Sequence, residues 1–356
     1  MSRAPSPRPR RGQAGLIAAI AIAVVVVVAV GGVFAFALLR PEPATMPTPT
    51  PSPAVTTPTP SVPALPTATP VPTPSPARPS PLAQGCEGSS TLMTVWAHPD
   101  DDIIFANPTI SDAVAAGRCV RSVFITAGDA GEGMDYVTAR ELGILRAYNA
   151  MRGADGEWDA TEITLDTGVQ VRRLAPKNDA RLSVLYLRLP DGNLTGAGFG
   201  STAHATLGKL YDGAVGSLLP VDGGPPVTRD QLVGSIREMA TAFTPDSTLT
   251  HIPRGSAFAP GDHPDHSVVG SLIRDALTSD TSVGPGIRYF VGYPSENLPP
   301  NLQGAVLDAK VDTFRIYTQQ DQVVRCVDRN ACLKTRKFGE WLQRSYPKAE
   351  ADLQMG

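Results

Sequence analysis

Two short clusters of histidine and aspartate are the residues most able to do chemistry in this chain. The first, AHPDDD at residues 97–102, directly follows an apolar run that is typical of a buried strand, and the second is GDHPDH at residues 261–266. The whole chain has only five histidines. Imidazole and carboxylate groups at the carboxyl ends of strands are typical of metal and ligand sites in α/β proteins. We therefore predict one divalent cation between the two clusters.

The spacing within the clusters suggests which residues hold this cation. His98 and Asp101 are three residues apart in a turn, so that both can reach one ion, and His266 can supply a third ligand. Two histidines and one carboxylate leave an open coordination position, as in catalytic zinc sites. Zn2+ is the expected ion, and Fe2+ or Co2+ accept the same ligands. The alternative is that each histidine only caps a helix or forms a local hydrogen bond.

Three further side chains of the clusters are not needed as ligands. Asp100 is placed to take the proton of a zinc-bound water, whose pKa falls to about 7, as the water attacks a carbonyl. His263 is expected to stabilise the oxyanion or to protonate the leaving amine. Asp265 is expected to orient a ligand histidine from outside the coordination sphere. A helix N-cap is the alternative role for Asp100.

These motifs resemble those of the GlcNAc-phosphatidylinositol de-N-acetylase family, also called PIG-L or LmbE-like. The resemblance rests on AHPDD at residues 97–101 and HPDH at residues 263–266. Between them, RELG followed by AY at residues 140–148 is similar to the family's Arg-Glu helix, and LRLPDG at residues 187–192 to its strand ending in Pro-Asp-Gly. The similarity extends over about residues 91–277.

Membership in this family implies a Rossmann-like fold and a zinc site with the ligands and acid–base roles given above. It also implies that Arg140 and Asp191 contact hydroxyl or phosphate groups of the substrate. A helix salt bridge and a turn are their respective structural alternatives. The family usually has glutamate at the position of Asp102, whose shorter side chain reaches less far, and we assign this residue no role.

Apolar, β-rich runs alternate with helical patterns from residue 91 onward. Expected strands are residues 91–97, 120–126, 183–189, 249–253 and 287–293, and expected helices are residues 108–116, 138–151, 229–242 and 264–277. This alternation predicts an α/β fold with a mainly parallel sheet flanked by helices, in a single catalytic domain at residues 85–348. The glycine-rich residues 192–224 are expected to form a long loop beside the site.

The composition of the first 84 residues indicates a targeting segment and a linker rather than part of a folded core. Residues 1–13 hold four arginines, and residues 14–39 are uncharged and long enough to cross a hydrocarbon layer of about 30 Å. The arginines place the N-terminus in the cytoplasm and the rest of the chain outside. A cleaved signal peptide, which would make the protein secreted, is the alternative. Residues 40–84, with 16 prolines, predict a disordered linker.

The cysteines and the charge restrict the setting further. Four cysteines fit an oxidising compartment, and we predict the pairs Cys86–Cys119 and Cys326–Cys332, although four cysteines allow three connectivities. The formal net charge of −3 gives no field that would favour nucleic acid, so no nucleic-acid partner is expected.

The expected function is that of an extracytoplasmic, zinc-dependent N-deacetylase of the cell envelope, acting on an N-acetylated sugar or a related glycoconjugate. One alternative is hydrolysis of another small conjugate, such as the amide of a thiol conjugate. A single three-ligand site argues against two-metal phosphoester chemistry. Another alternative is a non-catalytic, wall-associated carbohydrate-binding module, against which the presence of both Asp100 and His263 speaks.

Overall fold

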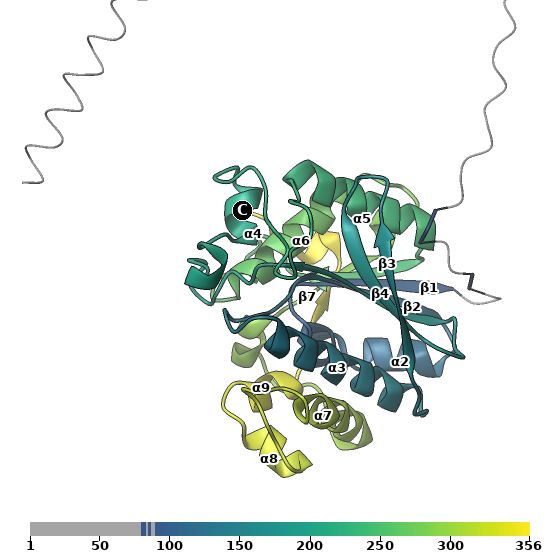
Figure 1. The fold of residues 1–356 in the computed structure, drawn as a ribbon. Helices are drawn as coiled ribbons and strands as arrows, with labels where there is room; N and C mark the ends of the chain where they lie inside the picture. Colours follow the sequence, from purple (N-terminus) through teal and green to yellow (C-terminus); the bar gives the residue numbers. More distant parts are fainter. Residues whose placement is uncertain (1–79, 83–84, 87–89) are drawn as a thin grey trace, which may run out of the picture. The chain divides into compact units, whose positions relative to one another are not determined.

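A computed structural model describes residues 80–82, 85–86 and 90–356 (Figure 1). An eight-stranded sheet forms its centre, in the order β3-β4-β5-β2-β1-β6-β7-β8. The five strands from β5 to β7 in this order run parallel, and the strands at both edges pair antiparallel. The strands are β1 (Thr91–Trp96), β2 (Cys119–Thr126), β3 (Trp158–Thr164), β4 (Gln170–Pro176), β5 (Leu182–Leu189), β6 (Ser247–His251), β7 (Ile287–Phe290) and β8 (Pro347–Lys348).

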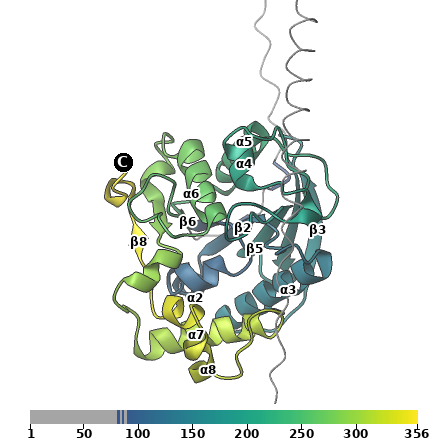
Figure 2. The same cartoon turned by 90° about the vertical axis from the view of Figure 1, so that its left-hand side faces the viewer.

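Helices cover both faces of the sheet, with α4, α5 and α6 on one side and α2, α3 and α7 on the other (Figures 1 and 2). The longer helices are α2 (Thr109–Ala115), α3 (Met134–Met151), α5 (Arg229–Phe243), α6 (Pro264–Leu277) and α7 (Gly304–Thr318). The shorter ones are α4 (Leu207–Tyr211), α8 (Arg329–Lys334) and α9 (Phe338–Leu342), and a π-helical turn, η1 (Asp102–Ala106), follows β1. The predicted α/β fold is thus confirmed.

The central strands are buried over their whole length because both faces of the sheet are covered. Successive side chains of β1 point to opposite faces, so that Met93 and Val95 belong to the core beneath α5 and α6. Leu92 and Trp96 belong to the core shared with α3 and α7. This layering fixes the end of β1, and therefore the residues that follow it, between two packed cores.

Each of the five predicted strands and four predicted helices has a counterpart, and the bounds of α6 are those predicted. Three expectations were incomplete. The β3–β4 hairpin was missed because β3 is an edge strand whose side chains are mostly exposed, so that it lacks an apolar pattern. Helices α7 to α9 were also missed. The stretch at residues 192–224 is not all loop, since it contains α4 and the 3-10 turn η2 (Gly200–Thr202).

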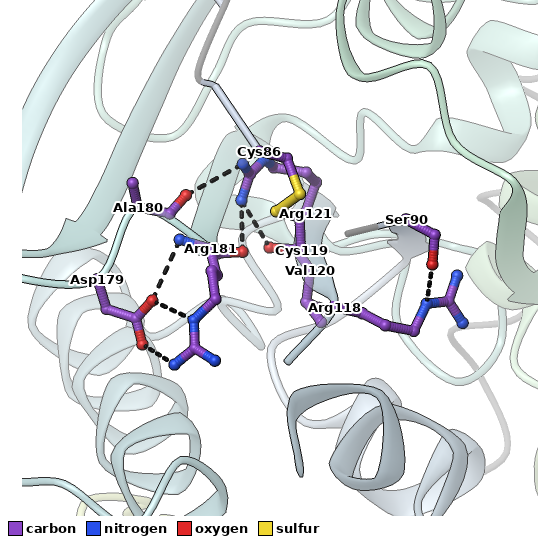
Figure 3. The surroundings of a disulfide bond; sticks show 9 residues. All are labelled: Cys86, Ser90, Arg118, Cys119, Val120, Arg121, Asp179, Ala180 and Arg181. Atoms are coloured by element: carbon purple, nitrogen blue, oxygen red, sulfur yellow. Dashed lines mark hydrogen bonds and ion pairs between the residues drawn. A yellow bond between two sulfur atoms is a disulfide. The ribbon is translucent and has the colours of Figure 1, made fainter. Parts of the chain in front are cut away.

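Both predicted disulfides are confirmed. Cys86 pairs with Cys119 at the start of β2, and Cys326 pairs with Cys332 in α8. Beside the first bond, the buried Arg121 donates to the main-chain carbonyls of Ala180 and Arg181 (Figure 3). The bond joins the segment before β1 to the start of β2, and the contacts of Arg121 join β2 to the residues that precede β5.

The predicted cytoplasmic N-terminus and membrane-spanning segment lie outside the described residues, as does nearly all of the predicted linker. Within the described ranges, no helix combines the length and apolar character needed to cross a bilayer. At the other end, the ordered chain continues past residue 348, and Leu353 is buried against the main domain.

Candidate active site

The candidate site lies at the carboxyl ends of the parallel strands. His98 follows β1, Asp191 follows β5, and the loop after β6 leads to His263 at the N-terminus of α6. The chain leaves β1 for β2 on one side, while β6 lies on the other side of β1. Ligands bind in α/β sheets at such a switch point, because the loops there diverge and leave a crevice.

The structure brings together the three predicted metal ligands, and Asp101 lies at their centre. Its carboxylate is 3.2 Å from His98 Nδ1 and 3.1 Å from His266 Nε2. Its Oδ2 also accepts the main-chain N–H of His98 at 2.7 Å, which fixes the turn after β1. All three side chains are buried. The two clusters, far apart in the sequence, therefore lie together, as the predicted site between them requires.

His266 is oriented by Asp262, a residue to which the sequence analysis gave no role. Asp262 Oδ1 is 2.8 Å from His266 Nδ1, one helical turn away, so that Nε2 is turned toward Asp101. This buried Nε2 has no hydrogen-bond partner with acceptable geometry among the described residues. A carboxylate behind one ring nitrogen and an unsatisfied second nitrogen are the features of a metal-ligating histidine. The i, i+4 spacing of Asp262 and His266 was the signal that could have revealed this pair.

His251, which ends β6, also reaches the cluster. It is fully buried, its Nε2 lies 3.2 Å from Asp101 Oδ2 and accepts the N–H of Ala97, and its ring stacks on that of His266 at 4.0 Å. Burial and the neighbouring His266 lower its pKa to about 4. His251 is therefore a neutral neighbour of the predicted ligands.

The charges of the cluster fit a bound cation. Burial alone would lower the pKa of His266, but Asp101 and Asp262 raise it to about 9. Burial would likewise raise the pKa of Asp101, yet His266 and His98 hold it well below its usual range. Ligand atoms of Asp101, His251 and His266 all lie within 4.8 Å of one another, and so do those of His98, His263 and His266. Buried carboxylates require compensating charge, which a divalent ion would supply.

Asp100, the predicted base, is paired with Arg140 from α3. The Arg140 Nη2 to Asp100 Oδ1 distance is 2.7 Å, and the other guanidinium nitrogens donate to the Gly128 carbonyl and the Tyr317 hydroxyl. Burial raises the pKa of Asp100 to about 7, although Arg140 opposes the shift. Arg140 thus orients the base, in addition to lining the pocket where a substrate would bind.

His263 forms the N-cap of α6, where its Nδ1 accepts the main-chain N–H of Asp265 at 3.2 Å. Since Nδ1 is an acceptor, the neutral ring carries its proton on Nε2, 4.0 Å from Asp191 Oδ1. Burial, followed by the neighbouring His98, lowers the pKa of His263 to about 3. His263 therefore presents a neutral N–H donor to the pocket.

Asp191 and Asp265 lie on the other side of His98. Asp265 Oδ2 is 3.3 Å from His98 Nε2 and accepts the N–H of Gly192 at 2.7 Å, the position expected of a carboxylate that orients a histidine. A Cβ at position 192 would lie 2.4 Å from Asp265 Oδ1, which explains the glycine after Pro-Asp. Asp191 Oδ1 lies 4.0 Å from His98 Nε2 and lines the pocket.

Asp102, where the chain departs from the family pattern, faces away from this site. Its side chain is fully buried, and its Oδ2 accepts the Tyr148 hydroxyl at 2.9 Å, in a network that continues to Ser122. Burial raises the pKa of Asp102 to about 7. The residue contributes to the packing of α3 on the sheet rather than to the pocket.

A pocket of about 660 Å³ opens over the cluster. The predicted residues His98, Asp100, Asp101 and His263 line one side. The other side comes from residues 293–341, which carried no recognised motif. We call these residues the C-terminal wall. Within it, Tyr293 packs edge-on against His266 at 5.0 Å, and its main-chain N–H donates to Asp262 Oδ1.

A family model described as "PIG-L: GlcNAc-PI de-N-acetylase" matches residues 93–277, just over half of the chain. The matched region includes both histidine–aspartate clusters, and the C-terminal wall lies outside it. A comparison with curated proteins gives no match.

Several solved structures are similar to the chain. N,N'-diacetylchitobiose deacetylase from Pyrococcus horikoshii is 15% identical, with 67% of this chain and 73% of that chain covered and a TM-score of 0.36. A deacetylase of teicoplanin biosynthesis is 16% identical, with coverage of 65% and 84% and a TM-score of 0.39. The 4-carboxy-2-hydroxymuconate hydratase of Pseudomonas putida is 12% identical, with coverage of 71% and 82% and a TM-score of 0.36.

Proposed function

Because the chain belongs to the PIG-L family of GlcNAc-PI de-N-acetylases, we propose that it is a metal-dependent N-deacetylase that hydrolyses the acetamide of an N-acetylated sugar or a related glycoconjugate. The observation that supports this most is the position of Asp100. A carboxylate whose pKa is raised to about 7 lies in the pocket beside the predicted metal ligands and is held there by Arg140. Such a group is suited to general-base catalysis near neutral pH.

His98, Asp101 and His266 are the residues that would hold the cation, with Zn2+ as the expected ion. A divalent cation at this point would lower the pKa of a water toward about 7 and polarise a carbonyl group. The support is the geometry of Asp101 between the two histidines and the unsatisfied His266 Nε2.

The protein's own groups then divide the remaining work. Asp100 accepts the proton of the attacking water, and Arg140 keeps its carboxylate oriented. The His263 Nε2–H donates a hydrogen bond to the oxygen that becomes negative as the amide carbonyl is attacked. The proton held by Asp100 can pass to the amine as the C–N bond breaks, which releases acetate and a free amino sugar. In this scheme Arg140 and Asp191 also face hydroxyl groups of the substrate.

Acetate release from a panel of N-acetylated sugars tests this function. We expect turnover by the metal-loaded protein, loss of turnover after chelation, and recovery with Zn2+, Fe2+ or Co2+. His266→Ala should lose both metal and activity, whereas His204→Ala, which alters an exposed histidine outside the site, should lose neither. Full deacetylase activity in a metal-free preparation would contradict the proposal. Hydrolysis of a thiol-conjugate amide without turnover of any sugar would favour the alternative enzyme.

For location, we propose that residues 14–39 anchor the protein in a membrane, with the catalytic domain outside the cytoplasm. The uncharged length of this segment and the arginines before it support an anchor, and the two disulfides support an oxidising compartment. Fractionation of cells that express the full chain tests this. Recovery of the intact protein in the soluble fraction would contradict the anchor.

A further inference from the structure

The C-terminal wall contributes three aromatic rings to the pocket, and one of them, Tyr293, contacts the rings of His263 and His266. Tyr293 and Trp341 stack with ring centroids 4.3 Å apart and planes at 5°, and the Trp341 indole N–H donates to the Tyr293 carbonyl. Phe338 packs edge-on against Trp341 at 5.1 Å. All three line the pocket, together with Val323, which is 72% exposed. Trp341 is buried, and Tyr293 and Phe338 are partly exposed to the pocket. Apolar and aromatic side chains that line a pocket beside convergent polar groups are typical of a ligand-binding site.

The backbone that presents these groups is strained at one residue. Lys337 has φ of 69° and ψ of −58°, and the Phe338 N–H donates to the Arg336 carbonyl at 2.9 Å, which defines a γ-turn. This turn is rare for a residue with a side chain, and strain of this kind persists only where the surroundings enforce it, often at functional sites. Here the turn places Arg336 and Phe338 on either side of its apex, and both line the pocket.

Arg336 differs from the other arginine and lysine side chains of the pocket. Arg140 is paired with Asp100, and the Lys337 ammonium is paired with Glu296 at 2.6 Å. In the part of the chain that the structure describes, Arg336 forms no ion pair, and its side chain is exposed at the pocket rim. A guanidinium in this position matches the geometry of a carboxylate or a phosphate.

The pocket is large for an acetamido sugar alone. Its volume of about 660 Å³ is in the range that encloses ligands of drug size, and it extends from His98 to Arg336. Polar side chains such as Asn193 and Glu296 line it together with the aromatic rings. A pyranose ring, with an apolar C–H face and hydroxyls at its edge, suits this mixed lining better than a hydrocarbon chain does.

We propose that the C-terminal wall is a second sugar subsite, in which a pyranose ring linked to the acetylated sugar packs against Phe338 and an anionic substituent of that ring pairs with Arg336. This inference rests on the proposed deacetylase function for the position of the first ring. It assigns substrate selection to a region outside the matched family domain. The preferred substrate class is therefore an acidic, N-acetylated oligosaccharide.

Two disaccharides and two variants test this subsite. The probes are N,N'-diacetylchitobiose and N-acetylglucosamine linked to N-acetylmuramic acid, whose second ring carries a carboxylate. The full-length protein should have a kcat/KM about tenfold higher for the acidic disaccharide, the difference that one charge-assisted hydrogen bond supplies. Arg336→Gln should abolish this preference through KM. Lys334→Gln removes the same charge two residues away, outside the pocket, and should leave the preference intact.

Phe338→Leu tests the apolar half of the subsite. Leucine keeps apolar contact with the neighbouring rings but removes the flat face, so KM should rise about tenfold for both disaccharides while kcat changes less. Circular dichroism and the thermal midpoint check that the variant is folded. Equal kcat/KM for the two disaccharides in the full-length protein, or a preference that survives Arg336→Gln, would overturn the proposal.

Binding measured by calorimetry separates this inference from the proposed function. If neither disaccharide releases acetate, the deacetylase proposal fails for these sugars, and the affinities still decide the subsite. About tenfold tighter binding of the acidic disaccharide, lost in Arg336→Gln, would support it. Equal affinity for both probes, or binding of neither, would reject it.

Discussion

The two sides of the pocket consist of different kinds of side chain. The side within residues 93–277 holds buried carboxylates and imidazoles, each fixed by a neighbour, as His266 is by Asp262. The C-terminal wall holds aromatic rings and, in the turn between α8 and α9, an exposed arginine, and a disulfide joins α8 to the segment before it. In the proposed function the first side supplies the groups that the reaction needs, and in the proposed subsite the second side selects the substrate. The two proposals together assign chemistry and specificity to separate parts of this chain.

The largest expected effect is on the chemical side. Asp100→Asn keeps the shape of the side chain but cannot accept the proton of the attacking water, so we expect kcat to fall about 10²- to 10⁴-fold. The metal content, measured by atomic mass spectrometry, should stay at the level of the unmodified protein. Loss of metal together with activity would show instead that Asp100 belongs to the ligand set.

The two disulfides are expected to contribute different amounts to the free energy of unfolding. The chain-entropy relation predicts that removing Cys86–Cys119 (sequence separation 33) costs about 3.7 kcal/mol, and removing Cys326–Cys332 (sequence separation 6) costs about 2.2 kcal/mol. Paired Cys→Ser variants in urea titrations measure both values. Loss of the second bond should also weaken binding of a disaccharide, because Cys326 lies two residues after Val324, which lines the pocket together with Val323. An equal cost for both bonds would contradict the loop-length argument.

Asp262 lies at the border between the two sides. Asp262→Asn should lower metal affinity about 10- to 100-fold, since a carboxylate behind a ligand histidine makes the ring a stronger donor. Competition with a chromogenic chelator measures this. Asp246→Asn, which alters an exposed aspartate near Arg118, is the matched control and should leave metal affinity unchanged. Equal metal affinity in the two variants would show that Asp262 does not support metal binding by His266.

The smallest expected effect concerns Lys310, which is buried in α7, within the C-terminal wall, and does not line the pocket. Its ammonium donates to the Arg344 carbonyl, and burial lowers its pKa to about 7. Because the unfolded chain keeps this proton up to about pH 10.4, unfolding takes up a proton at Lys310 between these values. Lys310 alone therefore makes the free energy of unfolding rise with pH, by at most about 1.4 kcal/mol per unit, while His266, whose pKa is raised to about 9, acts in the opposite direction in both proteins. Lys310→Met should remove this rise. Urea titrations of both proteins at pH 7 and pH 9 test the difference, and parallel curves would refute it.

The sequence indicated which residues of the chemical side would lie together, because they follow strands whose burial is visible as apolar runs; their roles in metal binding and catalysis stay predictions. His98, Asp101 and His266 stand beside such strands or at a helix start, where spacing determines which atoms can meet. Asp262 was not predicted, because its role depends on the contact of its carboxylate with His266 in α6, a helix that begins two residues later. The anchor at residues 14–39 stays a prediction, since it lies outside the described residues.

The C-terminal wall could not be predicted for a physical reason. Its contribution depends on which faces of Tyr293, Phe338 and Trp341 are turned to the pocket, and aromatic residues in short helices have the same local pattern when they only fill a core. The strain at Lys337 is likewise a property of the folded backbone. The edge strand β3 was missed for the opposite reason, because its exposed side chains leave no apolar period.

The contacts of Asp262 Oδ1 determine where the C-terminal wall could be separated from the rest of the chain in a chimeric protein. Asp262 Oδ1 accepts the N–H groups of His263 and Tyr293 as well as contacting His266 Nδ1, and a Cβ at Gly292 would lie 2.5 Å from the same carboxylate. The C-terminal wall is therefore not an interchangeable module that begins at residue 293. A chimera that grafts it onto another deacetylase would have to carry Asp262 and Gly292 with it, so the smallest transferable unit begins at the second histidine–aspartate cluster.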